Sequence, residues 1–446
     1  MSLGNKAKVF LLFVGDVAAL YAGLFLTLLL RYGGGFWKQF LDAHAWPFTI
    51  IFIPWLLVFY VAGLYDLRRL RNNLDFFKTL ALSLVANALI AVSLFYFVAA
   101  LGIAPKTNLF IFIVIFAVIE IAWRRAFNRA TGSGEAPNRV LLVGEGPTAA
   151  EVELSIAENP QLGYDIVAHL AEDAASRAPA SLEAAARDAR ANVVVVPREL
   201  KRRDGLTRTL YELFGRGTTI LDLETFYEIV MRKVPLSDVE ETWFLENIEN
   251  AAKFYDPFKR AIELLFAVAL GFVLLPLEIL IALLVVLTSR GPAIYRQSRV
   301  GEHGHIFTLY KFRTMRRDAE ARNGVQWAAK KDPRTTAIGR VLRASHLDEL
   351  PQLWNIVKGD VSFVGPRPER PEWVAKLKND IPFYEVRLLV TPGVTGWAQL
   401  NYRADQTTDD VKQKLQYDVY YLKNRSPILD LAIILKTIKS LFVNPE

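Results

Sequence analysis

The chain of 446 residues contains no cysteine, which excludes disulfides, thiolate nucleophiles and zinc sites built on cysteine. It has only five histidines, scattered through the sequence, so a histidine-rich metal site is not expected either. A bound metal should therefore take oxygen ligands, which favours Mg²⁺.

Apolar and basic residues, by contrast, are abundant. Hydrophobic residues make up 52% of the chain, which is high for a soluble protein and indicates a membrane protein. The formal charge of +7 at pH 7 indicates an anionic partner. Membrane lipids suit a hydrophobic basic chain better than nucleic acid does, so we expect no nucleic-acid partner.

Four apolar runs are long enough, or nearly so, to cross a bilayer as helices: 8–30, 48–65, 76–100 and 108–123. Cations gather before the first run (Lys6, Lys8), between the second and third (Arg68, Arg69, Arg71, Lys78) and after the fourth (Arg124, Arg125, Arg129). By the positive-inside rule, both ends of this group face the cytoplasm. We therefore predict a four-helix transmembrane bundle over residues 1–130.

A fifth apolar run, 261–288, is divided by Pro276 into two halves that are each too short to cross. Lys259 and Arg260 precede it and Arg290 follows it, so both ends should remain in the cytoplasm. We expect a re-entrant membrane helix. The alternative is an ordinary kinked span.

Residues 138–250 alternate between strand and helix patterns and predict a cytosolic Rossmann-like α/β domain, with strands at 139–143, 164–170, 192–196 and 218–222. Gly144-Glu-Gly-Pro-Thr-Ala149 has the spacing of a phosphate-binding turn. However, Pro147 occupies the point where a phosphate would meet the helix N-terminus. The acidic residues Glu172 and Asp173 also come later than the usual offset. The domain either binds a nucleotide or serves as a scaffold or dimerisation module.

Asp348 and Glu349 form an adjacent carboxylate pair at the head of a short predicted helix. Neighbouring residues on a helix point about 100° apart, so such a pair serves two different partners better than it shares one. One carboxylate can attack a phosphorus atom while the other holds a metal ion. A Lys-Gly-Asp turn and the rigid corner Pro366-Arg-Pro368 follow within a short distance.

Five motifs follow one another between about Pro257 and the C-terminus: Tyr295-Arg-Gln-Ser-Arg-Val-Gly301, Tyr310-Lys-Phe-Arg-Thr-Met315, Leu347-Asp-Glu-Leu-Pro-Gln-Leu353, Gly365-Pro-Arg-Pro368 and Thr391-Pro-Gly-Val-Thr-Gly-Trp-Ala-Gln399. Through these motifs, this part of the sequence resembles the polyprenyl-phosphate hexose-1-phosphate transferases of bacteria. The N-terminal half looks like that of the long members of this group. The implied third domain, 257–446, is a mostly helical catalytic domain anchored by the re-entrant helix.

The resemblance implies transfer of a hexose 1-phosphate from a UDP-sugar to undecaprenyl phosphate, with release of UMP. Asp348 matches the nucleophile, which forms an aspartyl-phosphosugar intermediate, and Glu349 matches the carboxylate associated with Mg²⁺; we place both at the metal. Substrate contacts are expected from Lys311, Arg313, Arg343, Asp360, Arg367 and Gln399. Asp360 either supports the metal or caps a turn, and Arg340 binds phosphate or simply lies at the surface.

The resemblance also implies a multi-pass protein of the bacterial inner membrane, with its catalytic domain in the cytoplasm, that starts exopolysaccharide, O-antigen or capsule synthesis. We expect a homodimer. The segment Glu369-Arg-Pro-Glu-Trp373 resembles branches that use UDP-glucose. Residues 427–443 form either an interfacial helix or a packed one.

The alternative function is that of a membrane-anchored, NAD-dependent nucleotide-sugar dehydratase or epimerase. Such enzymes need a Tyr-x-x-x-Lys pair on one face of a helix. The match in this chain is Tyr255-Asp-Pro-Phe-Lys259, where Pro257 argues against a helical pairing.

Overall fold

The computed structural model describes residues 3–66, 70, 72, 74–97, 106–132, 138–201, 203, 205–248, 255–315, 334–402 and 407–443. Arg68, Arg69 and Arg71, the end of the third predicted span at 98–100 and the end of the predicted Rossmann-like domain at 249–250 lie outside these residues. The chain divides into two compact units, Met1–Met231 and Arg232–Glu446.

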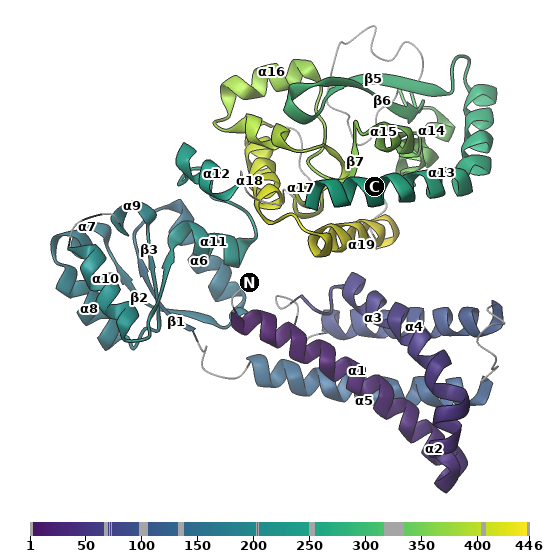
Figure 1. The fold of residues 1–446 in the computed structure, drawn as a ribbon, viewed down its shortest axis with the longest axis horizontal. Helices are drawn as coiled ribbons and strands as arrows, with labels where there is room; N and C mark the ends of the chain where they lie inside the picture. The colour runs from purple at the N-terminus through teal and green to yellow at the C-terminus, as the bar shows by residue number, and fades with distance from the viewer. Residues whose placement is uncertain are drawn as a thin grey trace. The chain divides into compact units, whose positions relative to one another are not determined.

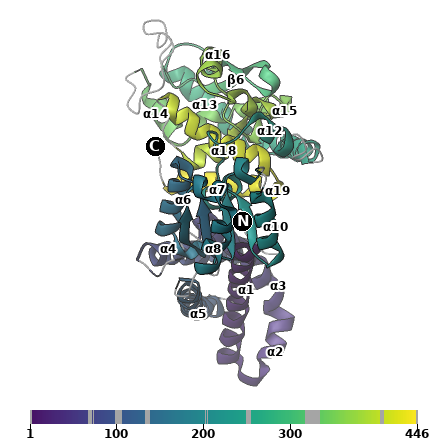
Figure 2. The same ribbon diagram turned by 90° about the vertical axis from the view of Figure 1, so that its left-hand side faces the viewer.

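The first unit begins with long helices: α1 (Leu3–Tyr32), α3 (Ala45–Ala62), α4 (Leu74–Phe97) and α5 (Lys106–Gly132). Figure 2 shows α1 and α3 running antiparallel, joined through the short helix α2 (Phe36–Gln39). The interior is aromatic: the ring of Trp55 lies 5.5 Å from that of Phe112 and 5.4 Å from that of Phe116. The outer faces are apolar too, with Leu82 71% exposed, which is typical of helices that meet lipid.

Three helical stretches of the described residues are long and apolar enough to cross a membrane: Ala7–Ala62, Phe76–Phe95 and Tyr255–Thr288. The first contains the first predicted span and most of the second, and the second contains most of the third predicted span. The fourth predicted span, 108–123, lies within α5 and is not among these stretches. A bundle that crosses four times therefore stays a prediction.

A buried charged cluster joins α1 to α5. The Arg124 guanidinium donates to the Asp16 carboxylate at 2.5 Å and to Glu120 at 2.7 Å, and all three side chains are fully buried. Asp16 also accepts hydrogen bonds from the Tyr65 hydroxyl and the Trp123 indole. Because an unpaired charge in an apolar interior costs several kcal/mol, these contacts fix the two helices against each other.

The rest of the first unit is an α/β fold. Its four strands, β1 (Asn138–Val143), β2 (Tyr164–Leu170), β3 (Val193–Val196) and β4 (Thr219–Asp222), form one parallel sheet in the order β2-β1-β3-β4. The predicted strands are confirmed to within one residue. Figure 1 shows helices on both faces: α6 (Pro147–Glu158) and α11 (Leu223–Met231) on one, α8 (Pro179–Asp188) and α10 (Leu206–Gly215) on the other. Short α7 (Glu172–Arg177) and α9 (Arg198–Lys201) complete the connections.

The glycine turn after β1 is crowded by an acidic side chain. Gly144 has a φ of +107°, and a Cβ atom there would lie 3.1 Å from the Glu172 carboxylate and 3.1 Å from Pro197. α6 begins with Pro147. A carboxylate beside the turn repels phosphate, which favours the scaffold interpretation of this domain over nucleotide binding.

The second unit is mostly helical, with two small sheets. The antiparallel hairpin of β5 (Ile294–Val300) and β6 (Ile306–Phe312) is followed by α14 (Ala337–Ala344) and α15 (Gln352–Lys358). β7 (Ser362–Val364) pairs in parallel with β8 (Gly393–Thr395), and α16 (Pro371–Asp380) lies between them in sequence. α17 (Trp397–Asn401), α18 (Thr408–Asn424) and α19 (Pro427–Val443) close the unit.

The boundary between the units lies earlier than the predicted one near residue 250. Val234, together with Trp243 and Phe244 of α12 (Glu241–Asn247), is buried in the core of the second unit. The ring of Phe244 lies 4.7 Å from that of Phe383, and the Trp397 indole donates to the carbonyl of Arg232. Residues 232–248 therefore belong with the C-terminal unit, because their aromatic side chains are buried there.

The fifth apolar run forms α13 (Tyr255–Thr288), a 34-residue helix that contains Pro276. Figure 1 shows that α13 turns along its course before the chain enters β5. Both ends contact the same unit: Ala267 packs with Phe307, and Val285 packs with Phe312. Between these contacts lies an apolar, exposed stretch, with Phe272 79% and Val273 70% exposed.

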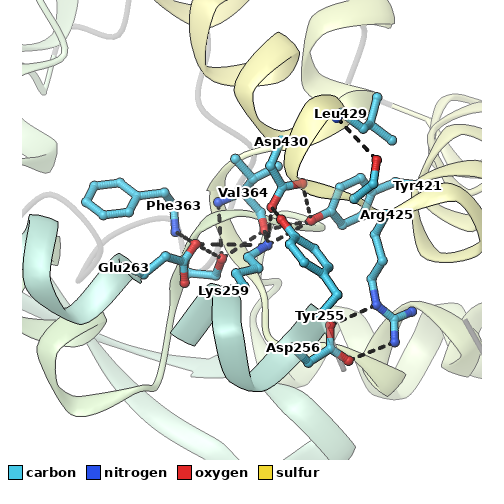
Figure 3. Close-up of polar contacts among 12 residues, drawn as sticks. Tyr255, Asp256, Lys259, Glu263, Phe363, Val364, Tyr421, Arg425, Leu429 and Asp430 are labelled. Carbon is cyan, nitrogen blue, oxygen red and sulfur yellow. Dashed lines mark hydrogen bonds and ion pairs between the residues drawn. The ribbon is translucent and has the colours of Figure 1, made fainter. Parts of the chain in front are cut away.

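A polar network fixes the start of α13 (Figure 3). The Lys259 ammonium lies 2.7 Å from the Asp430 carboxylate of α19 and donates to the carbonyl of Val364 in β7. The hydroxyls of Tyr255 and Tyr421 also donate to Asp430. The helix begins at Tyr255 despite Pro257, because a proline in the first turn removes an N–H that has no helical partner. The expectation that Pro257 prevents a helical pairing here was therefore wrong.

Candidate active site

The carboxylate pair lies in a single turn of 3₁₀-helix, Leu347–Glu349, between α14 and α15. His346, just before the turn, has a φ of +53°, a left-handed conformation that redirects the chain from one helix to the next. The two adjacent carboxylates have different surroundings, as the sequence pattern predicts.

Glu349 is held by two cations. Its Oε1 lies 2.6 Å from the Lys311 ammonium of β6 and 3.2 Å from the Arg367 guanidinium. Burial by itself would raise the pKa of Glu349, but the charges of Lys311 and Arg367 outweigh it and lower the pKa to about 2. Glu349 is therefore ionised at neutral pH.

Asp348 is buried, with 7% of its surface exposed, and makes no hydrogen bond or ion pair to the residues that the structure describes. Burial raises the pKa of Asp348 above its usual value, and the nearby charge of Lys311 opposes this rise. A carboxylate that no hydrogen bond holds keeps its lone pairs available for attack on an electrophile.

Arg343 of α14 is the third cation of the site. Its guanidinium donates to the Thr314 hydroxyl at 2.9 Å, and its charge favours the ionised form of Asp348. Arg340, one turn earlier in the same helix, is exposed. Both interpretations of Arg340 therefore stay open.

Three other predicted site residues make supporting contacts. The Arg313 guanidinium donates to the carbonyls of Ser289 and Arg290, and so caps the end of α13, where the helix dipole favours a cation. Asp360 accepts a hydrogen bond from the Asn355 amide, and Gln399 donates to the carbonyl of Val394. Direct roles for Arg313, Asp360 and Gln399 in substrate binding stay predictions.

The sequence pattern did not single out Asn355, although it holds the site together. This fully buried side chain of α15 accepts from the backbone N–H of Tyr310 and donates to the carbonyl of Thr308, both in β6. It thereby fixes the strand of Lys311 against the helix that comes after Glu349. The sequence does not reveal this role, because it depends on the burial of Asn355 against β6 in the folded protein.

The magnesium site expected at Asp348 and Glu349 stays a prediction. Among the described residues no group of three or more histidine, aspartate or glutamate side chains is placed to bind a metal. Mg²⁺ needs fewer protein ligands, because it keeps several waters and binds through one or two carboxylates plus substrate phosphates. Asp348 and Glu349 are carboxylates of this kind, and they would hold the ion together with a diphosphate.

Comparisons with known proteins find related proteins that match this part of the chain. A 187-residue segment, 42% of this chain, is 41% identical to a UDP-N-acetylgalactosamine-undecaprenyl-phosphate N-acetylgalactosaminephosphotransferase of Aeromonas hydrophila, of which it covers 44%. Over 186 residues, 41% of this chain, it is 40% identical to an undecaprenyl-phosphate glucose phosphotransferase of Komagataeibacter xylinus, of which it covers 35%. The chain thus matches less than half of the length of these two relatives.

A shorter relative is covered almost completely. Over 155 residues, 35% of this chain, the identity to a putative undecaprenyl-phosphate N-acetylgalactosaminyl 1-phosphate transferase of Bacillus subtilis is 44%, and the match covers 83% of that protein. Residues 254–444, which contain the whole site, match the bacterial sugar transferase family. The chain therefore belongs to the bacterial sugar transferases.

Proposed function

We propose that this protein transfers a sugar 1-phosphate from a UDP-sugar to undecaprenyl phosphate and releases UMP. The main support is the contrast within the carboxylate pair: Glu349 is held by Lys311 and Arg367, whereas Asp348 is buried without a hydrogen-bond partner among the described residues. The names of the two longer relatives agree with this chemistry but specify different sugars.

In the first step, a carboxylate oxygen of Asp348 attacks the phosphorus that bears the sugar. The bond from this phosphorus to the bridging oxygen breaks, and UMP leaves with the electron pair. In the second step, an oxygen of undecaprenyl phosphate attacks the same phosphorus, and the Asp348 carboxylate leaves. Two half-reactions let one site serve a soluble donor and a lipid acceptor in turn.

The chief obstacle to this reaction is repulsion between anions. Lys311 and Arg367 contact Glu349, and the charge of Arg343 acts on Asp348, so phosphate oxygens can meet fixed positive charge at the pair. A bound Mg²⁺ would neutralise part of the diphosphate charge and orient it. Lys311 and Arg367 already neutralise the charge of Glu349. Glu349 therefore repels the UDP-sugar less strongly than an unpaired carboxylate would.

The decisive experiment measures UMP release from a panel of UDP-sugars, with undecaprenyl phosphate and Mg²⁺ present. The panel includes UDP-glucose, which the sequence favours, and UDP-N-acetylgalactosamine, which the name of the Aeromonas relative specifies. We expect turnover with one of them that depends on the lipid acceptor. No turnover with any UDP-sugar would reject the proposal.

The pH dependence of transfer follows from the nucleophile. Asp348 attacks only when ionised, and burial raises its pKa. The rate should therefore fall as the pH drops through this raised pKa, at a higher pH than an exposed aspartate would give. Glu349, with a pKa of about 2, stays ionised in this range and does not contribute to the fall in rate. Single-turnover rates between pH 4 and 8 measure this fall in rate. A rate that stays constant over this range would contradict the assignment of Asp348 as the nucleophile.

We further propose that α13 is re-entrant, in a multi-pass protein of the inner membrane with its catalytic domain in the cytoplasm. A straight 34-residue helix would extend about 50 Å at 1.5 Å per residue. Both of its ends nevertheless contact one unit, and the exposed apolar stretch lies between them. The exposed stretch would enter the membrane and return to the same side.

Cysteines introduced singly before Lys259 and after Arg290 test the topology, because the chain has no cysteine of its own. Both should be labelled by a membrane-impermeant thiol reagent from the cytoplasmic side of the membrane. Pro276→Leu should favour a straight helix and shift part of the second label to the other side. Labelling of the wild-type positions from opposite sides would contradict re-entry.

All of the proposed chemistry lies in the second unit, so a chain that starts at Arg232 should retain transfer activity in detergent. A chain that starts at residue 250 lacks Val234, Trp243 and Phe244, whose burial contributes about 1.5–3 kcal/mol per side chain. It should therefore melt at a lower temperature than the longer truncation. Loss of activity in a folded 232–446 chain would mean that the first unit contributes to the site.

The rival dehydratase or epimerase function finds no support at its key pair. Tyr255 and Lys259 both contact the buried Asp430 in the network of Figure 3, where they connect α13 to α19. A structural role explains both side chains. A homodimer stays a prediction, which light scattering of the detergent-solubilised protein tests.

A further inference from the structure

The segment Pro366-Arg-Pro-Glu369, which consists of the corner with Arg367 and the residue after it, is held along its whole length. Its four consecutive backbone carbonyls each accept a hydrogen bond: Pro366 from the Gly393 N–H (2.9 Å), Arg367 from the Arg387 guanidinium (3.0 Å), Pro368 from the Arg299 guanidinium (2.9 Å) and Glu369 from the Val300 N–H (2.9 Å). Two of these four donors are arginine side chains. These two guanidinium groups connect the backbone of the segment to side chains from other parts of the unit.

Arg387 is the more deeply buried of the two. It is 7% exposed and lies in the 3₁₀-helical segment Tyr384–Leu389. Its guanidinium donates to the Tyr384 hydroxyl at 3.0 Å and lies 3.0 Å from the Asp418 carboxylate of α18, which is 2% exposed. A buried guanidinium is expensive unless it is paired, and Asp418 provides the opposite charge. The remaining donor capacity is directed at the carbonyl of Arg367.

The carbonyl of Arg367 is bound by Arg387, whereas its side chain contacts the carboxylate pair. The side chain is 39% exposed and reaches Glu349 at 3.2 Å, next to Asp348. The flanking Pro366 and Pro368 restrict the backbone, since proline fixes its own φ and disfavours the helical conformation of the residue before it. The two prolines do not fix the position of the corner relative to the rest of the unit. The hydrogen bonds to its carbonyls do so, because they connect the corner to β5, to β8 and, through Arg387, to α18.

The end of β7 gives the corner a second support. The carbonyl of Val364 accepts from the Lys259 ammonium at 2.6 Å (Figure 3). Gly365 then lies so close to β8 that a Cβ atom would come within 2.8 Å of the Gly393 nitrogen. The chain therefore enters the corner from a fixed point, and Arg387 and Arg299 hold the next residues of the corner in place.

We propose that Arg387, with Asp418 as its buried counter-ion, is a positioning residue that holds Arg367 against Glu349 and the incoming phosphate. This inference rests on the proposed function. It assigns Arg387 no contact with substrate. Its effect on rate passes through Arg367, because a displacement of a positioned group by about 1 Å can cost on the order of 10²-fold in rate.

The test uses Arg387→Lys in the full-length protein. Lysine keeps the charge beside Asp418, but its single ammonium cannot reproduce the planar fork that also reaches the carbonyl of Arg367. We expect kcat to fall by about 10- to 100-fold with a much smaller change in KM for the UDP-sugar. The matched control is Arg425→Lys, at an arginine of the same unit that is paired with Asp256, and it should leave kcat within about twofold.

A double-variant cycle separates positioning from general destabilisation. In an Arg367→Gln background, Arg387→Lys should lower kcat by less than about twofold further, because the group that it positions is already gone. Hydrogen exchange of the peptide that covers residues 365–370 should also become faster in Arg387→Lys than in the wild type. Multiplicative losses in the double variant, or an unchanged kcat in Arg387→Lys, would overturn the proposal.

Two further measurements cover the cases in which Arg387→Lys does not fold or the wild-type protein has no transfer activity. If Arg387→Lys does not fold, Arg299→Lys perturbs the same corner through the Pro368 carbonyl and should give the same pattern; an unchanged kcat there overturns the proposal. If the wild-type protein transfers no sugar phosphate, the proposed function fails. The exchange measurement then decides by itself whether Arg387 holds the corner.

Discussion

Asp348→Asn is expected to lower the rate of UMP release by at least about 10³-fold while the protein remains folded. An amide is neither charged nor nucleophilic enough to attack phosphorus. The structure gives a reason to expect normal folding, because the Asp348 carboxylate has no hydrogen bond or ion pair among the described residues that the change would remove. Steady-state assays in detergent, together with thermal unfolding, measure both properties.

The matched control is Asp380→Asn at the end of α16, which replaces an exposed carboxylate with the same amide and should leave the rate unchanged. Incubation with the UDP-sugar alone gives a second readout. The wild type should release up to one UMP per site without lipid acceptor, and Asp348→Asn should release none. More than a few per cent of wild-type activity in the variant would show that Asp348 is not the nucleophile.

Glu349→Gln should lower the rate by about 10²- to 10³-fold for a different reason. The change removes the anion that faces Lys311 at 2.6 Å and Arg367 at 3.2 Å, so both cations lose the partner that orients them. It also removes one of the two carboxylates that fit Mg²⁺. We expect the Mg²⁺ concentration for half-maximal rate to rise, and high Mg²⁺ to restore part of the activity.

Asp348→Asn provides the contrast for this prediction, since no Mg²⁺ concentration can replace a nucleophile. Glu372→Gln is the matched control, because Glu372 is a largely exposed glutamate whose partner Arg370 lies 3.8 Å away. An unchanged Mg²⁺ dependence in Glu349→Gln would contradict the role of Glu349 at the metal. A loss of rate without that change would leave Glu349 as the residue that orients Lys311 and Arg367.

Much of the architecture could be predicted because it depends on local pattern. Valine-rich runs such as 193–196 predict buried parallel strands, and all four strands of the sheet lie where the sequence places them. The run with Pro276 forms the long helix α13. By contrast, the domain boundary near residue 250 differs from the structure. Trp243 and Phe244 have no strong local pattern, and only their burial among side chains distant in sequence assigns them to the second unit.

The sequence by itself determined the family, which the comparisons confirm. Through the short motifs of that resemblance it also predicted the carboxylate pair Asp348 and Glu349 and the cations Lys311 and Arg367 as site residues. Only the tertiary structure decided which carboxylate is paired, that Arg313 caps α13, and that Arg387 holds the carbonyl of Arg367. The physical reason is that burial and hydrogen bonding depend on contacts between segments far apart in the chain. Arg387 and Asp418, for example, are 31 positions apart in sequence, yet their charged groups lie 3.0 Å apart in the folded protein.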